Sequence, residues 1–319
     1  MKRKSLLIRG IAILLTLGSF SVPSIKGETL GYSMSENKEE SLGLYRIKIN
    51  GKYGCINKTG EVVINPQFDM VWDFSEGLAC IGIGENLENR RYGFIDKSGR
   101  IVINPQFDWV ENFSDGLAAV KIAGKYGFID NTGRYVINPQ FDVAMSFSEG
   151  LACVGIGERG NWKYGFIDKS GQYVISPQFD IASSFSEGLA CIGIGERGKW
   201  KRGFIDKTGQ YVINPQFDYA QDFFGGLATV KIAGKYGFID NTGKIVINPQ
   251  FDNAIGDFSD SLVGVEINGR WGYIDKIGQY VINPQFDEVQ PFSDGLAAVW
   301  INGEQCYIDK TGKFIYPNK

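Results

Sequence analysis

The chain has 319 residues, a formal net charge of -3 and no histidine. The lack of histidine removes the most common general base and metal ligand, and the mildly acidic balance disfavours a nucleic-acid partner. Hydrophobic residues make up 43% of the sequence, enough for a sizeable core, and 42 glycines indicate many turns.

The N-terminus has the three-part pattern of a secretory signal peptide. A basic start is followed by a mostly apolar run from Leu6 to Leu17 and then by small serines. This run is short for a membrane span. We therefore predict a signal peptide at 1–27, a flexible polar linker at 28–42, and an exported protein that is secreted, periplasmic or on the cell surface. Cleavage of the segment and its retention as an anchor both remain open.

One sequence pattern recurs from residue 43 to the C-terminus. Its marks are an aromatic-Gly-Phe-Ile-Asp string, a Pro-Gln-Phe-Asp string and a Phe-Ser-Glu/Asp-Gly-Leu-Ala string. Eight units begin near Gly43, Gly77, Gly116, Gly150, Gly188, Gly226, Ser261 and Gly295. A repeated short unit predicts a stacked array, in which each unit covers its neighbour.

Each unit is predicted to be a three-stranded antiparallel meander. In the unit that begins at Gly116, residues 117–122 and 126–130 form a hairpin, whose turn is Asn-Gly in several other units. A three-residue turn leads to a third strand at 134–138, which Pro139 ends because proline has no N–H. The predicted fold is thus all-β, a tandem array of eight such units at 43–319. An open superhelical array is favoured, and a closed toroid or propeller-like ring is the alternative.

A glycine recurs in the middle of the second strand, where glycine normally weakens a sheet. Counting residues across the turns pairs Gly127 with Val120 on one side and with Ile137 on the other. We predict that an aromatic ring of the Tyr135 type lies over this glycine.

The connector between units carries Phe141, Ala144 and Phe147 at a spacing of three. This spacing predicts one helical turn, with Asp142 as its cap, and a short fourth strand is the alternative.

The units differ most in the first hairpin. The second, fourth and fifth units carry inserts at 85–90, 158–162 and 196–200, and insertions in a repeat array often mark a functional edge. Aromatic columns should mostly form the core between units, and a basic column beside them is either a ligand ribbon or a solvated edge balanced by acids. The candidate ligand-binding residues are Arg91, Tyr92, Trp162, Tyr164, Trp200, Arg202 and Trp271.

The five cysteines predict no metal site, because their spacings fit no zinc motif. Cys80, Cys153 and Cys191 occupy one repeat position, which small residues fill in other units, so we interpret the column as half-buried packing. A disulfide between Cys153 and Cys191 remains open.

The strings around Trp271-Gly272 and the Tyr-Gly-Phe-Ile-Asp copies resemble the bacterial WG-repeat family, also called KWG repeats. The resemblance covers residues from Gly43 to the C-terminus, although tyrosine replaces tryptophan in most units. It implies a β-rich, non-catalytic array, often found outside the cytoplasm, and it supplies no binding residues.

Other functional signals are weak. Two Gly-x-Gly-x-x-Gly strings, at 155–160 and 193–198, precede strands and not helices, so no nucleotide site or other cofactor is predicted. The acidic residues recur at turn positions and show no break in symmetry that would suggest catalysis. We expect no enzyme, but an extracytoplasmic scaffold that binds a protein or peptide. The alternative is a glycan or cell-wall binding module that uses aromatic residues between repeats.

Overall fold

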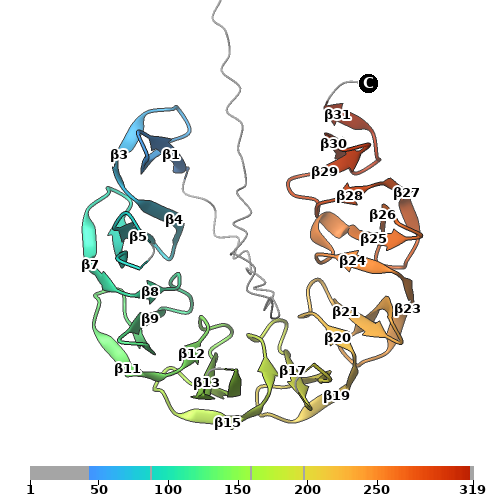
Figure 1. Ribbon diagram of the computed structural model, residues 1–319, viewed down its shortest axis with the longest axis horizontal. Helices are drawn as coiled ribbons and strands as arrows, with labels where there is room; N and C mark the ends of the chain where they lie inside the picture. The colour runs from blue at the N-terminus through green and yellow to red at the C-terminus, as the bar shows by residue number, and fades with distance from the viewer. Residues whose placement is uncertain (1–42, 87, 159, 197, 317–319) are drawn as a thin grey trace, which may run out of the picture. The chain divides into compact units, whose positions relative to one another are not determined.

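The computed structural model describes residues 43–316, except 87, 159 and 197. Within this part, eight antiparallel sheets follow one another in chain order (Figure 1). The first sheet has three strands and each of the other seven has four. The described residues form no α-helix, only a 3-10 turn, η1 (Ser259–Ser261). The all-β repeat fold is therefore confirmed, whereas the predicted signal peptide and linker lie outside the described residues.

Each four-stranded sheet consists of a connector strand, two hairpin strands and a return strand, in that order. The connector strands are β4 (Met70–Ser75), β8 (Trp109–Val110), β12 (Val143–Ala144), β16 (Ile181–Ala182), β20 (Tyr219–Ala220), β24 (Asn253–Ile255) and β28 (Glu288–Val289). The return strands are β3 (Val62–Phe68), β7 (Ile101–Phe107), β11 (Tyr135–Phe141), β15 (Tyr173–Phe179), β19 (Tyr211–Phe217), β23 (Ile245–Phe251), β27 (Tyr280–Phe286) and β31 (Phe314–Tyr316).

The hairpins lie between these two kinds of strand. They are β1 (Tyr45–Ile49) with β2 (Lys52–Ile56), β5 (Leu78–Ile83) with β6 (Arg91–Asp96), β9 (Ala118–Ile122) with β10 (Lys125–Ile129), β13 (Ala152–Glu158) with β14 (Asn161–Ile167), β17 (Ala190–Ile194) with β18 (Lys201–Ile205), β21 (Leu227–Ile232) with β22 (Lys235–Asp240), β25 (Val263–Ile267) with β26 (Arg270–Ile274), and β29 (Leu296–Ile301) with β30 (Glu304–Asp309). The turn after Ile122 has positive φ at Ala123 and Gly124, as a two-residue hairpin requires. The predicted pairing of Val120 with Gly127 is confirmed.

The connector forms a short strand, so the predicted helical turn is wrong and the alternative is correct. Val143 and Ala144 pair with Gly155 and Val154 of the next hairpin. After this short strand the connector continues beside the hairpin, with the Met145 N–H donating to the Cys153 carbonyl at 2.9 Å, so the spacing of three between the apolar residues is not helical. Asp142 caps no helix. Its carboxylate instead accepts hydrogen bonds from Lys125 and from the N–H of Gly157 in the next hairpin, as described below.

The return strand continues through its proline, contrary to the prediction that Pro139 ends it. A β-bulge shifts the register so that Phe128, and not Gly127, pairs with Ile137. A Cβ atom at Gly127 would lie 2.5 Å from the carbonyl oxygen of Ile137 and 2.7 Å from the nitrogen of Pro139. The glycine is thus required by the backbone of the bulge, and the predicted aromatic cover is wrong.

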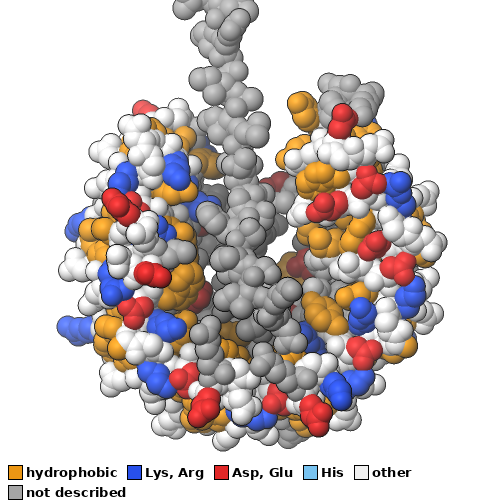
Figure 2. All heavy atoms as spheres, in the orientation of Figure 1, with side chains coloured by type: hydrophobic (Ala, Val, Ile, Leu, Met, Phe, Trp, Pro, Cys, Tyr) orange, Lys and Arg blue, Asp and Glu red, His pale blue; other side chains and the backbone are white. Residues whose placement is uncertain are grey.

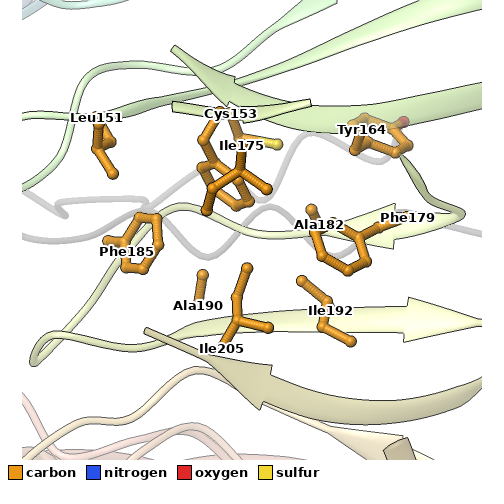
Figure 3. Close-up of a cluster of buried hydrophobic side chains, with 11 residues drawn as sticks. Leu151, Cys153, Tyr164, Ile175, Phe179, Ala182, Phe185, Ala190, Ile192 and Ile205 are labelled. Carbon is orange, nitrogen blue, oxygen red and sulfur yellow. The ribbon is translucent and has the colours of Figure 1, made fainter. Parts of the chain in front are cut away.

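Neighbouring sheets stack through two different faces. The face of a sheet that packs against the following sheet is called the trailing face, and in the fourth sheet it carries Cys153, Phe166 and Ile175. The face that packs against the preceding sheet is called the leading face, and in the fifth sheet it carries Ala190, Ile192 and Ile205. These residues form one buried cluster, in which Ala182 and Phe185 of the connector fill the space between the sheets (Figure 3). Because each sheet buries one face on each neighbour, the core is a series of clusters between sheets.

Polar contacts also join successive sheets at the start of each unit. The Glu149 carboxylate accepts hydrogen bonds from the backbone N–H of Gly188 at 3.2 and 3.1 Å, and it pairs with the Lys207 ammonium at 3.0 Å. We call this arrangement the inter-sheet clamp. Equivalent carboxylate-to-glycine bonds recur at Glu76–Gly116, Asp115–Gly150, Glu187–Gly226 and Asp260–Gly295.

Candidate functional site

The basic column is fully used in ion pairs with the aspartates that follow the return strands. Lys125, at the start of β10, donates to Asp142 at 2.5 Å, and the second oxygen of Asp142 accepts the N–H of Gly157 at 3.1 Å. The Lys125 hydrogen bond and charge hold the pKa of Asp142 below its usual value, together with that N–H. The other pairs are Lys52–Asp69, Arg91–Asp108, Lys163–Asp180, Lys201–Asp218, Lys235–Asp252 and Arg270–Asp287. The basic column is thus balanced by the aspartate column, whose member Asp142 is predicted to cap a helical turn.

Three candidate binding residues have structural partners. Arg91 pairs with Asp108 at 2.9 Å. The rings of Tyr92 and Tyr164 are only 2% and 5% exposed and lie in the clusters between sheets. In this structure these tyrosines act as packing residues, as expected for most of the aromatic column.

The three tryptophans proposed for binding lie in different places. Trp162 and Trp271 are half-buried against the clusters that follow the fourth and seventh sheets. Trp200 is half-buried in the wall of an open hollow of about 380 Å³, which Gly198, Lys199, Lys201 and Asp218 also line. The structure does not bring the three indoles together.

Arg202 replaces the aromatic residue of its column and organises a polar cluster between the fifth and sixth sheets. Its Nη1 donates to the carbonyl of Ala220 at 2.9 Å, and its guanidinium lies 4.6 Å from the ring centre of Tyr219. Nearby, the Ser183 hydroxyl donates to Asp222 at 2.5 Å. Burial raises the pKa of Asp222, against the opposing effects of the Ser183 hydrogen bond and the Arg202 charge.

A second departure from repeat symmetry was missed in the sequence. Trp72 and Trp109, on the connectors of the second and third sheets, meet edge to face with ring centres 5.3 Å apart. Both indoles are half-buried and contact Tyr92 beneath them. The sequence did mark Trp72 as unusual, because other units have Met145, Ser183 or Gln221 in its place.

Two polar groups lie beside this tryptophan pair. The Trp109 indole N–H donates to Glu111 at 2.9 Å, while burial raises the pKa of the Glu111 carboxyl. The Oδ1 atom of Asn112 is buried and has no hydrogen-bond partner among the described residues. In the same repeat position, Asp222 accepts from Ser183, whose equivalent in the second sheet is Trp72. Asn112 therefore lacks the hydroxyl partner that Asp222 has.

The surface also carries a repeated apolar feature. The first two residues of seven return strands are each 38–50% exposed, and we call them the outer band. The pairs are Val62–Val63, Ile101–Val102, Tyr135–Val136, Tyr173–Val174, Tyr211–Val212, Ile245–Val246 and Tyr280–Val281. Figure 2 shows that hydrophobic side chains alternate with charged ones over the visible face.

The cysteines are buried, free thiols, so the structure has no disulfide between Cys153 and Cys191. Desolvation raises the pKa of Cys153 and raises that of Cys191 to about 12. Across residues 43–316, outside the three omitted positions, no group of three or more acidic or thiol side chains is arranged to hold a metal ion. In the same part of the chain, no helix has the length and apolarity needed to cross a membrane.

Comparison with known proteins supports the fold and the repeat. A eukaryotic initiation factor shares the fold at a TM-score of 0.60, with 10% identity over 86% of this chain and 84% of its own. The uncharacterized protein lmo1340 from Listeria monocytogenes EGD-e gives a TM-score of 0.43, with 11% identity over 86% of this chain and 99% of its own. No curated protein matches the sequence. At such identities these likenesses concern the fold alone.

The sequence pattern described as "WG containing repeat" matches this chain seven times, at residues 53–86, 92–126, 126–162, 164–200, 203–236, 236–271 and 271–304. These matches cover most of the chain and span the hairpins and return strands of successive sheets. The chain therefore belongs to the WG-repeat family.

Proposed function

We propose that this protein is a non-catalytic, exported scaffold that binds a protein or peptide through the outer band. The observation that carries the proposal is the recurrence of two adjacent exposed apolar residues in seven successive return strands. Exposed apolar surface that repeats along a molecule is costly in water and is typical of interaction surfaces. A regular array of such pairs suits an extended partner or one with several copies of a motif.

The array itself is proposed to be open, not closed into a ring. Tyr45 of the first sheet and Tyr316 of the last sheet are 43% and 66% exposed. Both lie on faces that are buried between sheets elsewhere, so the two ends do not cover each other within the chain. Small-angle scattering of the exported protein would give an elongated profile for an open array and a compact one for a ring.

The experiment that tests the scaffold is binding of the exported protein to isolated envelope fractions, before and after protease treatment of those fractions. Loss of binding after protease indicates a protein partner. A triple variant Val136→Lys, Val174→Lys and Val212→Lys should then lose binding, because each lysine places a charge in the outer band. The control carries Gln140→Lys, Gln178→Lys and Gln216→Lys, at exposed positions of the same strands. Equal binding by both variants would exclude the outer band.

A second candidate function is glycan binding, favoured by the pair of Trp72 and Trp109. A half-exposed indole offers a flat apolar surface on which a sugar ring can stack. In this case binding survives protease, and Trp72→Ala reduces retention on purified cell wall. Trp162→Ala, in a half-buried position of a long hairpin, serves as the control.

A further inference from the structure

The two ends of the array expose faces that are buried in every junction between sheets. On the first sheet, Tyr45 is 43% exposed, whereas Ala152, at the same position of the fourth sheet, is fully buried. The neighbouring Ile47 corresponds to the buried Val154 and is itself only half-buried. The first sheet therefore presents a leading face that no sheet covers.

The last sheet presents the complementary surface. Tyr307 and Tyr316 are 39% and 66% exposed. Their equivalents in the fourth sheet, Phe166 and Ile175, are 0% and 4% exposed because the fifth sheet packs on them. The last sheet thus has a trailing face without a following sheet. The two tyrosine hydroxyls make this face more polar than the internal ones, which suits a surface that is wet for part of the time.

The ends also keep the two halves of the inter-sheet clamp. Asp294 follows Ser293 as Glu149 follows Ser148, and both acidic residues have positive φ, 51° and 54°. On the first sheet, Gly43 and Lys58 stand where Gly188 and Lys207 stand in the fifth sheet. The Lys58 side chain passes close to Gly43, since a Cβ there would lie 3.3 Å from its Cε. Of the residues that the structure describes, none forms a hydrogen bond or ion pair with the side chain of Asp294 or Lys58.

We propose that the trailing face of the last sheet binds the leading face of the first sheet of a second copy of this chain, head to tail. In this junction Asp294 of one copy pairs with Lys58 of the next, as Glu149 pairs with Lys207 within the chain. The partner is another copy because the chain itself provides both faces, and because both stay exposed in the single chain. A head-to-tail contact of this kind uses two different surfaces, so it extends the array by whole chains.

Among the described residues, the first sheet has no connector strand, and we therefore expect the junction between copies to be weaker than an internal one. Inside the array, the connector contributes buried residues such as Ala182 and Phe185 to the interface. The first sheet has only three strands among the described residues and lacks this contribution. Association is therefore reversible and depends on protein concentration.

Sedimentation velocity of the exported protein, from low micromolar to several hundred micromolar, tests the proposal. The average mass should rise with concentration. The single variants Lys58→Asp and Asp294→Lys should each lower the association constant by about tenfold or more, because each puts two like charges together. The double variant restores the opposite charges and should recover association. Lys244→Asp, an exposed lysine in a turn of the sixth sheet, is the charge-matched control and should behave as wild type.

Carbodiimide coupling then identifies which chains are joined. Equal amounts of unlabelled and nitrogen-15-labelled protein are mixed, coupled and digested, and the Lys58–Asp294 peptide is examined by mass spectrometry. Mixed-isotope peptides in statistical amounts support the head-to-tail junction. Peptides of a single isotope type would mean that the chain closes on itself, and a mass independent of concentration without any such peptide would mean that the faces do not meet. Either result overturns the proposal.

Discussion

In the third sheet, Gly127 faces the carbonyl oxygen of Ile137 so closely that an added Cβ would lie 2.5 Å from it. The obstacle is the backbone of a bulge and cannot turn away as a side chain would. We expect Gly127→Ala to lower the free energy of unfolding by about 1–3 kcal/mol. Urea denaturation followed by circular dichroism measures this change.

The matched control for this substitution is Gly193→Ala. Gly193 also lies within a hairpin strand, but its added Cβ would meet the Ile181 side chain at 3.1 Å. Other units carry Lys121 and Lys231 in this position, so a side chain is accommodated there. If Gly193→Ala destabilised the protein as much as Gly127→Ala, the bulge would not be the cause.

The turn aspartates make the array sensitive to acid. Oδ1 of Asp130 accepts hydrogen bonds from the Thr132 N–H at 2.9 Å, the Thr132 hydroxyl at 2.6 Å and the Arg134 N–H at 3.1 Å. The hydroxyl bond is the main reason why the pKa of Asp130 lies below its usual value. Asp130→Ala removes all three bonds and should cost about 1–2 kcal/mol of unfolding free energy at neutral pH.

The pH dependence follows from the direction of this shift. A carboxyl whose pKa is lower in the folded state stabilises the fold fully above its unfolded pKa of about 3.9, and this contribution is lost as the pH falls through the folded pKa. Asp130→Asn should therefore flatten the loss of stability below about pH 4. Its geometry is already present in the chain, since Asn57 accepts the same bonds from Thr59 and Glu61. An unchanged pH profile in thermal melts would contradict the prediction.

The carboxyl of Asp222 shows the opposite behaviour. Its pKa is raised in the folded state because burial penalises the charge, so the ionised group opposes folding more as the pH rises above about 4. We expect Asp222→Asn to raise the melting temperature at neutral pH, and this gain should shrink as the pH falls towards 4. A gain that is the same at both pH values would mean that the carboxyl is not desolvated.

The thiols should be unreactive in the native protein. All five cysteines are buried, and desolvation raises the pKa of Cys80, Cys153 and Cys191, which leaves almost no thiolate. We expect almost no reaction with a thiol reagent in the folded state and five equivalents of reaction in denaturant without reductant. Three equivalents in denaturant would reveal a disulfide.

The repeat, the hairpins and the all-β class could be predicted because they depend on local signals, such as turn glycines and alternating apolar residues. The bulge at Pro139 could not, because proline alone suggests the end of a strand and only the pairing with β10 shows that the strand continues. The connector was assigned to a helical turn for a related reason, since a two-residue strand is too short to show alternation.

Among the candidate residues, Tyr92 and Tyr164 show that recurrence at one repeat position does not reveal whether a side chain binds a ligand or packs in the core. A tyrosine that recurs looks the same in sequence whether its ring is buried between sheets or open to a ligand. The tryptophan pair was missed for the opposite reason. Trp72 and Trp109 stand in columns that vary between units, and their contact arises from the stacking of two sheets and not from any spacing along the chain.

The bulges also bear on solubility. A chain of sheets that all expose a long return strand at one edge could pair edge to edge with other chains and aggregate. Each of seven return strands is instead interrupted by a bulge at its proline, which breaks the regular ladder that an incoming strand would need. The glycine that accommodates the bulge therefore serves a second purpose, because it lets the protein keep apolar side chains at its edges without becoming a template for fibres.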